Sequence, residues 1–226
     1  MCKLQPTAAV ILCGGQSRRM GRPKATLPWG RQTMLEHVAA RLRQVPAVEH
    51  LVVVAAPGQR LPPLPEPAVV VRDRRPGLGP LEGLACGLRA AERLGCPAAY
   101  VTSCDVPALR PRFVRLVLDR LSGAQAAVPV ACGHKQVLAA AYRTELAAVI
   151  DELLEQQLQR PRDLLARIDT TWIAEEELRR VDPQLDSLQN LNTPEDYRRL
   201  LIRQGMPLPA WLEAGPEPPA APRPGS

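Results

Sequence analysis

Apolar runs of strand length alternate with helical patterns over roughly the first 130 residues, and this alternation limits the fold more than any other feature. A strand, a helix and a second strand in that order predict a parallel sheet with right-handed crossovers. Aromatic residues are only 3% of the chain, so Leu, Val and Ala must fill the interior, as in a parallel sheet covered by helices. The sequence therefore predicts an α/β fold of three layers, α/β/α, with a mostly parallel central sheet.

The predicted elements follow from the apolar spacing and from the turn residues between them. In the first half of the chain, strands are expected over 7–13, 50–56, 68–72, 98–103 and 125–130, and helices over 33–44, 79–94 and 112–121. The second half is expected to be helical after 137–142 as far as residue 158, helical again over 163–168, a late strand or extended turn over 187–192, and helical over 194–203.

The end of the chain differs in composition from the rest. From Gly205 onward proline, glycine and alanine dominate, with little apolar content. Such a segment buries too little apolar surface to offset the entropy of ordering. The sequence predicts one folded domain over 1–204 and a disordered tail over 205–226 that has no core to join.

The first predicted strand ends in a loop rich in glycine and positive charge. Gly14 and Gly15 follow the apolar run directly, and Arg19 and Lys24 come soon after. Glycines permit a tight turn and a close approach, consecutive backbone N–H groups hold an anion, and the cations neutralise phosphate oxygens. The spacing excludes both the Gly-x-x-x-x-Gly-Lys-[Ser/Thr] loop and the Gly-x-Gly-x-x-Gly loop. The segment predicts a triphosphate site, although a Gly-Gly pair alone is as often a simple turn.

Two carboxylates follow other predicted strands. Asp73 comes after the strand at 68–72, and Asp105 after the strand at 98–103. Ligands of parallel sheets sit at the carboxyl ends of the strands, so both residues are expected near the glycine loop. Asp105 suits Mg²⁺, which takes oxygen ligands and bridges to substrate phosphates. A turn aspartate remains the alternative for Asp105, and a salt-bridged surface acid for Asp73.

Two asparagines near the end of the domain have no structural explanation in the sequence. Thr193 and Pro194 are typical of a helix start, with Thr193 as the N-cap. That start does not account for Asn190 and Asn192, whose side-chain oxygens are suited to binding the same metal.

Composition excludes several other classes of function. The net charge of +6 comes without a lysine-rich stripe or aromatics for base stacking, so a small polyanionic substrate is expected rather than nucleic acid. Six scattered cysteines without a Cys-x-x-Cys pair argue against structural zinc. No signal peptide and no apolar run of membrane length are visible, so no membrane partner and a cytoplasmic location are expected. The three histidines show no nucleophile–base pattern.

Four motifs, in order, resemble those of nucleotidyltransferases of the glycosyltransferase-A type, most closely the molybdenum cofactor guanylyltransferase family. The matching positions are Leu12, Gly14, Gly15, Ser17, Arg19, Met20, Gly21 and Lys24; Gly79-Pro80-Leu81-Glu82-Gly83; Cys104-Asp105-Val106-Pro107; and Asn190-Leu191-Asn192-Thr193-Pro194-Glu195-Asp196. The chain departs from the family at Cys13, where alanine is usual, and at 133–138, where the family's Pro-Leu is absent.

The resemblance implies a fold and a reaction. The fold would be of the nucleotide-diphospho-sugar transferase (Rossmann-like) type. The reaction would transfer GMP from GTP to the terminal phosphate of molybdopterin, releasing pyrophosphate and making the guanine dinucleotide form of the molybdenum cofactor. Mg²⁺ would be the cofactor, GTP and molybdopterin the substrates, and a cofactor-accepting molybdoenzyme or chaperone a further partner.

The resemblance also implies roles for the matching residues. Nucleotide contacts would come from Leu12, Gly14, Gly15, Ser17, Lys24, Asp73, Gly79, Pro80, Leu81 and Asp105. The catalytic groups would be Arg19, Lys24 and Asp105, and the metal would be held by Asp105 with Asn190 or Asn192. The attacking phosphate monoester is already largely dianionic at neutral pH, so no general base is needed. Alignment and charge neutralisation would then carry the reaction.

Three alternative interpretations stay open at this point. A molybdopterin cytidylyltransferase shares the fold, but such chains more often carry Ala-Ala-Gly before the serine and lack Gly-Pro-Leu, so Gly14-Gly15 and Gly79-Pro80-Leu81 favour GTP. A sugar-phosphate nucleotidyltransferase is generally longer. A catalytically silent nucleotide-binding protein that delivers the cofactor is disfavoured by the intact Lys24 and Asp105.

Overall fold

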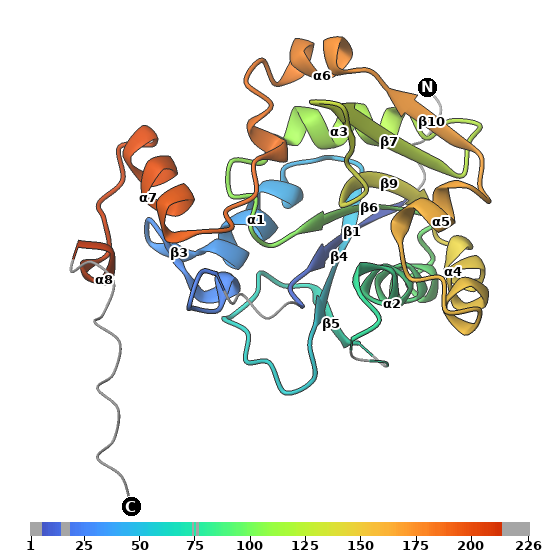
Figure 1. The fold of residues 1–226 in the computed structure, drawn as a ribbon, viewed down its shortest axis with the longest axis horizontal. Helices are drawn as coiled ribbons and strands as arrows, with labels where there is room; N and C mark the ends of the chain where they lie inside the picture. Colours follow the sequence, from blue (N-terminus) through green and yellow to red (C-terminus); the bar gives the residue numbers. More distant parts are fainter. Residues whose placement is uncertain (1–5, 15–18, 74, 76, 214–226) are drawn as a thin grey trace, which may run out of the picture.

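The computed structural model describes residues 6–14, 19–73, 75 and 77–213, and within this part of the chain eight strands form one mixed sheet (Figure 1). The strand order is β10-β7-β9-β6-β1-β4-β5, and β8 pairs with β7 outside this path. The strands span Thr7–Leu12 (β1), Val48–Ala55 (β4), Ala68–Arg72 (β5), Ala98–Ser103 (β6), Ala126–Ala131 (β7), His134–Lys135 (β8), Ala139–Arg143 (β9) and Thr170–Ile173 (β10). Within the main path only β9 runs antiparallel to its neighbours, so the predicted mostly parallel sheet is confirmed.

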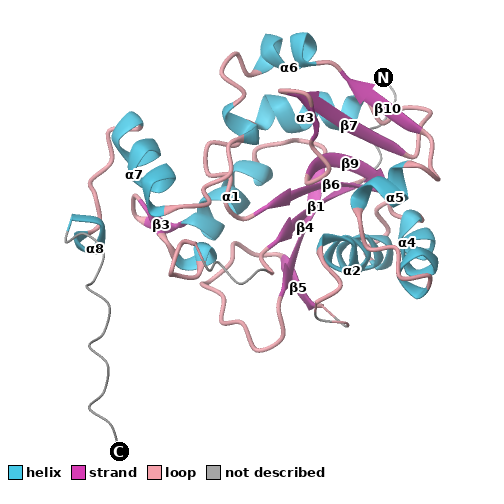
Figure 2. Ribbon diagram, viewed as in Figure 1, coloured by secondary structure: helices cyan, strands magenta, loops and turns pink. Residues whose placement is uncertain are grey.

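Helices cover both faces of this sheet (Figure 2). The helices α2, α4 and α5 pack on one face, and α1, α3 and α6 on the other. They span Met34–Arg43 (α1), Pro80–Arg93 (α2), Pro111–Asp119 (α3), Leu146–Glu155 (α4), Pro161–Leu165 (α5) and Glu175–Val181 (α6), followed by Pro194–Arg203 (α7) and Ala210–Glu213 (α8). The three-layer prediction is therefore confirmed. No helix among the described residues is long and apolar enough to cross a membrane.

The first strand is buried on both faces because it lies in the middle of the sheet. Successive side chains of a strand point to opposite sides. Ala9 and Ile11 accordingly join the core beneath α1 and α3, whereas Val10 and Leu12 join the core beneath α2. This two-sided burial is why β1 reads as an uninterrupted apolar run in the sequence.

The parallel strands bring three loops to one edge of the sheet. The backbone N–H of Cys104, just past β6, donates to the carbonyl oxygen of Leu12 in β1 at 3.1 Å. On the other side, the N–H of Asp73, just past β5, donates to the carbonyl oxygen of Ala55 in β4 at 3.1 Å. The segments that follow β1, β5 and β6 therefore leave the same end of the sheet, with β4 lying between β1 and β5, and the sequence predicts this common end.

A third, smaller core joins the first loop to the C-terminal helices. Two 3-10 turns, η1 (Lys24–Thr26) and η2 (Asp186–Leu188), and the hairpin of β2 (Pro28–Trp29) and β3 (Gln32–Thr33) lie outside the main layers. Figure 1 shows α7 and α8 beside this hairpin, away from the sheet. The core is made of Met20, Leu27, Trp29, Met34, Leu191, Tyr197, Leu200, Leu201 and Leu212.

The expectation that the chain has no core to join from residue 205 onward is wrong for its first part. Leu212 is buried in the third core, and Met206, Leu208 and Trp211 pack against it. The ring of Trp211 stacks on Tyr197 with centroids 5.9 Å apart. These large apolar side chains stand among prolines without a helical period, so the sequence pattern missed them. Residues 214–226 lie outside the described residues, and the domain boundary at 204 stays a prediction.

Other elements differ from the sequence prediction in ways that have physical reasons. The helix expected over 163–168 is α5, which begins at Pro161, a residue favoured in the first helical turn. The strand or extended turn expected over 187–192 instead begins as the 3-10 turn η2. The short strand β10 and the helix α6 were not predicted, because α6 buries only Leu178 and shows no apolar stripe.

Candidate functional site

Side chains from three of the four motifs meet at one point. The Nζ atom of Lys24 donates to Oδ2 of Asp105 at 2.7 Å and to Oδ1 of Asn192 at 2.9 Å. Asp105 lies 81 positions after Lys24 in the chain, and Asn192 lies 168 positions after it. The side chain of Lys24 is 16% exposed and that of Asp105 is 9% exposed, so the ion pair is largely shielded from water. The predicted convergence of these motifs is thus present in the fold.

Asp105 is held from both sides. The hydroxyl of Ser103 at the end of β6 donates to its Oδ1 atom. The backbone N–H of Leu191 donates to its carbonyl oxygen at 3.0 Å, and Leu191 is itself fully buried. These contacts fix both the backbone and one carboxylate oxygen, which leaves Oδ2 facing Lys24.

Asn192 is fixed by the start of α7. The carboxylate of Asp196 accepts hydrogen bonds from the backbone N–H groups of Asn192 and Thr193, at 3.2 and 3.0 Å. The hydroxyl of Thr193 accepts from the N–H of Asp196 at 3.2 Å, which completes a capping box. The cap accounts for Thr193 and Asp196, as the sequence indicates, and it also orients the asparagine before them.

A second group of predicted residues meets around Asp73. A Cβ atom added to Gly14 would lie 3.2 Å from Oδ2 of Asp73, and one added to Gly83 would lie 3.6 Å from Oδ1 of Asp73 and from Cδ2 of Leu12. The Oδ1 atom of Asp73 is buried without a hydrogen-bond partner among the described residues. Burial raises the pKa of the Asp73 carboxyl, and the charge of Glu82 raises it further. A buried acceptor between two glycines is suited to the N–H or O–H groups of a closely packed ligand.

The loop before α2 uses its glycine and proline for backbone geometry. Gly79 is the N-cap at φ 76°, a region that favours glycine, and Pro80 occupies the first helical turn. The side chain of Leu81 is buried in the core beneath α2. Gly79 and Pro80 therefore set the backbone of the turn before α2, and the buried side chain of Leu81 anchors this turn in the core.

Glu82, to which the sequence analysis gave no role, is one of the few buried acids in the described structure. Its Oε2 atom accepts from Nε and Nη2 of Arg75 at 3.1 and 3.0 Å. The same guanidinium donates to Asp151 of α4 at 2.8 Å, and Arg89 of α2 pairs with that carboxylate too. Its signal in the sequence was an acid within an otherwise apolar glycine motif.

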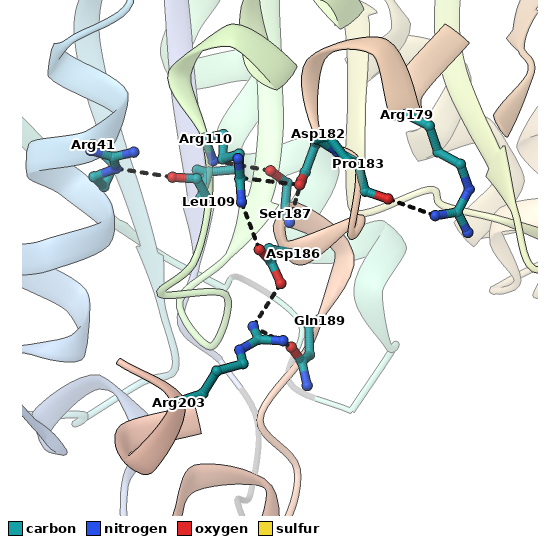
Figure 3. Close-up of polar contacts among 10 residues, drawn as sticks. All are labelled: Arg41, Leu109, Arg110, Arg179, Asp182, Pro183, Asp186, Ser187, Gln189 and Arg203. Atoms are coloured by element: carbon teal, nitrogen blue, oxygen red, sulfur yellow. Dashed lines mark hydrogen bonds and ion pairs between the residues drawn. The ribbon is translucent and has the colours of Figure 1, made fainter. Parts of the chain in front are cut away.

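A second missed cluster anchors the segment that leads to the asparagines (Figure 3). Nε of Arg110 lies 3.1 Å from Asp182, and its Nη2 donates to Asp186 at 2.8 Å. Nη2 of Arg203, from α7, donates to the other oxygen of Asp186 at 2.6 Å. The N–H of Ser187 donates to Asp182 at 2.8 Å. These contacts tie the η2 segment to α3 and α7. In the sequence these residues are charged side chains scattered along the chain, with no pattern that indicates their pairing.

Some predicted site residues do not join the Lys24 contact. Asn190 is exposed and lines a separate cavity of about 200 Å³ with Val106, Gln136 and Leu188. Of the two asparagines, Asn192 is therefore the one that shares the ammonium of Lys24 with Asp105. Arg19 is exposed in a turn. The predictions for Gly15 and Ser17 fall on residues outside those that the structure describes.

The oxygens around Lys24 fit a hard divalent cation. A carboxylate and an amide oxygen converge on the ammonium, and both are ligands that Mg²⁺ prefers. Among the described residues no group of three or more His, Cys, Asp or Glu side chains is placed to hold a metal. A cation at Asp105 would therefore depend on ligand phosphates and water for the rest of its coordination, which is typical of Mg²⁺ sites.

Replacing Asp73 by asparagine is expected to raise stability at neutral pH. The folded protein raises the pKa of this carboxyl above 3.8, so it binds the proton more tightly than the unfolded chain does. The free energy of unfolding therefore falls as the pH rises from the pKa of this carboxyl in the unfolded chain to its higher pKa in the folded protein. Asp73→Asn removes this penalty, which is modest because the group is partly exposed.

The measurement is the Tm of both proteins at pH 7 and near pH 4. The advantage of Asp73→Asn should shrink as the pH approaches the ordinary aspartate pKa, where the wild-type carboxyl takes up its proton. An advantage that stays constant over the whole range would contradict the prediction.

Comparison with known proteins identifies relatives over most of the chain. The family model described as the MobA-like NTP transferase domain matches residues 9–172. A probable molybdenum cofactor guanylyltransferase of Mycobacterium tuberculosis (strain H37Rv) is 45% identical over 152 residues, covering 66% of this chain and 74% of that protein. A protein of the same name from Mycobacterium avium (strain 104) is 39% identical over 197 residues, covering 85% and 94%.

Solved structures share the fold. Molybdopterin-guanine dinucleotide biosynthesis protein A from Archaeoglobus fulgidus superposes with a TM-score of 0.71 at 23% identity, covering 88% of this chain and 100% of that one. The protein Rv0371c from Mycobacterium tuberculosis H37Rv, in complex with manganese, superposes with a TM-score of 0.54 at 18% identity, covering 88% and 98%.

Proposed function

Because this chain belongs to the MobA-like NTP transferase family, we propose that it transfers GMP from GTP to the terminal phosphate of molybdopterin and releases pyrophosphate. The family resemblance found in the motifs is confirmed by the match over residues 9–172. Relatives at 39–45% identity carry the name molybdenum cofactor guanylyltransferase. The observation that carries the proposal is the convergence of Lys24, Asp105 and Asn192.

The proposed reaction needs no general base from the protein. The terminal phosphate of molybdopterin is the nucleophile, and it attacks the α-phosphorus of GTP while the bond to pyrophosphate breaks. We assign Lys24 and Arg19 to stabilising the charge that develops on the triphosphate, and Gly14, Gly15 and Ser17 to binding its phosphates. These roles agree with the residue types at the site, which are cations, glycines and side chains with oxygen ligands.

We assign a divalent cation, Mg²⁺, to the oxygens of Asp105 and Asn192. A cation held there would supply positive charge that neutralises the phosphate oxygens. Asp105 supplies the one carboxylate, and its two neighbours Ser103 and Leu191 keep it in place. Asn190, in its separate cavity, is not part of this assignment.

The base and ribose are assigned to the side of Asp73. Its buried oxygen accepts hydrogen bonds from N–H groups of guanine or from hydroxyls of ribose. Gly14, which has no side chain, leaves room for the nucleotide to approach this oxygen closely. Leu12 and the turn at 79–83 form the adjacent wall. A cytoplasmic location and a cofactor-accepting molybdoenzyme or chaperone as partner belong to the same proposal.

The test is pyrophosphate release by the purified protein with Mg²⁺, in the presence and absence of molybdopterin. GTP, CTP and sugar 1-phosphates with their nucleotides are compared side by side. Release that needs both GTP and molybdopterin is the expected result. Turnover with CTP instead of GTP would identify a cytidylyltransferase, turnover with a sugar 1-phosphate would identify a different acceptor, and nucleotide binding without turnover would favour a delivery protein.

A further inference from the structure

The ammonium of Lys24 occupies the position where an oxygen-coordinated cation is expected. It touches the carboxylate of Asp105 at 2.7 Å and the side-chain oxygen of Asn192 at 2.9 Å. Lysine carries a compact point charge with three donors, so it pairs with converging oxygens much as a small metal ion does. The oxygens proposed for the divalent cation are thus already satisfied by a positive charge from the protein itself.

Contacts that do not involve Lys24 hold the carboxylate of Asp105 and the backbone of Asn192. Ser103 and Leu191 hold Asp105, and the capping box at the start of α7 holds Asn192. The Asp105 carboxylate and the backbone that carries the Asn192 side chain therefore stay in place when Lys24 moves, so the same two residues can receive either cation.

Lys24 has the freedom to leave without moving its backbone. It begins the 3-10 turn η1, in which the N–H of Leu27 donates to its carbonyl oxygen at 3.2 Å. Ala25 and Leu27 are buried, which anchors the turn. The four-carbon side chain reaches the oxygens from this fixed base, so a change of rotamer alone redirects the ammonium. The glycine loop predicted to bind the triphosphate precedes it in the chain.

The charge at this point is insufficient for two cations at once. Asp105 carries the single negative charge that the Lys24 ammonium contacts. A dication placed on the same oxygens would meet a positive charge within a few ångströms in a shielded site, where charges interact more strongly than in water. A bound triphosphate changes this balance, because it adds several negative charges and accepts the ammonium on its own oxygens.

We propose that Lys24 and a divalent cation are alternative occupants of the Asp105–Asn192 oxygen pair, and that the cation enters when a triphosphate draws the ammonium away. Without nucleotide, Lys24 keeps the site closed to free metal. With nucleotide, one side chain leaves the metal ligands and contributes its charge to the phosphates. The inference rests on the proposed function in that it takes Asp105 as the metal ligand.

The experiment measures Mn²⁺ binding to the nucleotide-free protein by electron paramagnetic resonance. Lys24→Met removes the competing charge at nearly constant side-chain length, and Mn²⁺ is expected to bind at least about tenfold more tightly than to the wild type. Lys135→Met is the matched control, since Lys135 is exposed in β8 and lies over the ring of Trp172 at 4.4 Å. It removes the same charge elsewhere and is expected to change Mn²⁺ affinity less than about twofold.

A second variant locates the bound ion. Adding Asp105→Asn to Lys24→Met should abolish the gain in Mn²⁺ affinity. Circular dichroism melts establish that each variant is folded. An unchanged Mn²⁺ affinity in folded Lys24→Met would overturn the inference, and so would a gain that survives Asp105→Asn.

The chain also allows the lysine itself to be observed, because it contains only Lys3, Lys24 and Lys135. Protein labelled with ¹³C and ¹⁵N in lysine gives three side-chain signals, and the two methionine variants assign those of Lys24 and Lys135. Metal-free GTP is expected to shift the Lys24 signal and to leave that of Lys135 in place. A Lys24 signal insensitive to saturating GTP would overturn the exchange.

The turnover assay with wild-type protein separates this inference from the proposed function. Mn²⁺ competition without GTP turnover leaves the exchange of cations standing and removes the assigned reaction. GTP turnover with no effect of Lys24→Met on Mn²⁺ binding leaves the assigned reaction standing and removes the exchange of cations.

Discussion

Asp105→Asn is expected to lower the turnover of GTP by about 10²–10³-fold, which is typical of losing one group that stabilises transition-state charge. The substitution keeps the shape of the side chain, but it replaces one of the two acceptor oxygens by an NH2 donor. It also removes the negative charge that faces Lys24 at 2.7 Å. An amide is also a much weaker ligand for a divalent cation than a carboxylate. We therefore expect a lower kcat/KM for GTP at every Mg²⁺ concentration at which the protein stays in solution.

Pyrophosphate release measures the effect, and a thermal melt establishes that the variant is folded. Asp119→Asn serves as the matched control, because Asp119 is an exposed carboxylate that lies 3.7 Å from Arg115 at the end of α3. The control should turn over GTP at the wild-type rate. A folded Asp105→Asn protein with undiminished turnover would remove Asp105 from the catalytic groups.

The second large effect is expected on stability, from Gly87→Ala in the middle of α2. A Cβ atom at this position would lie 2.4 Å from Cγ1 of Val10 and 3.2 Å from Cγ2 of Val54. Both valines are buried, and their branched side chains are stiff. Overpacking of this kind costs about 1–3 kcal/mol, against which the better helix propensity of alanine returns about 0.5–1 kcal/mol. We expect a lower Tm, by roughly 2–4 °C for each kcal/mol lost.

Gly83→Ala, one helical turn earlier on the same helix, is the control for Gly87→Ala. Its Cβ atom would meet Asp73 and Leu12 at 3.6 Å, an ordinary contact. The Tm should stay the same or rise slightly, while the KM for GTP should increase because space beside Asp73 is lost. Equal losses of stability in both variants would contradict the assignment of the Gly87→Ala loss to the contacts with Val10 and Val54.

The sequence predicted the parallel half of the fold well because each of its strands is an apolar run between turn residues. Residues 7–13 and 98–103 have this form, since β1 and β6 are buried on both faces. The later part was harder to predict. The short strand β10 is only partly buried, and α6 carries three glutamates in its first turn and a single buried residue. Local patterns of this kind do not distinguish an edge element from a loop.

The site was predictable as a set of motifs and not as a set of contacts. Strand topology indicates that the segments after β1, β5 and β6 leave one edge of the sheet, and they do. No pattern in the sequence indicates that Lys24 donates a hydrogen bond to Asn192, 168 positions away, or that Asn190 lines a cavity with Gln136 and Leu188. Glu82 and Asp182 were missed because a buried acid resembles a surface acid until its arginine partner is located.

The third core has a consequence for how the protein is made. Asn192 and Tyr197 lie near the end of the domain, yet Tyr197 packs with Trp29 and donates to the carbonyl oxygen of Pro28. Since domains form from the N-terminus during synthesis, a nascent chain that has folded its sheet still lacks these contacts until the residues of α7 have left the ribosome. The pairing of Asp105 and Asn192 around Lys24 is therefore completed only after the sheet, because Asn192 follows every strand of the sheet in the chain.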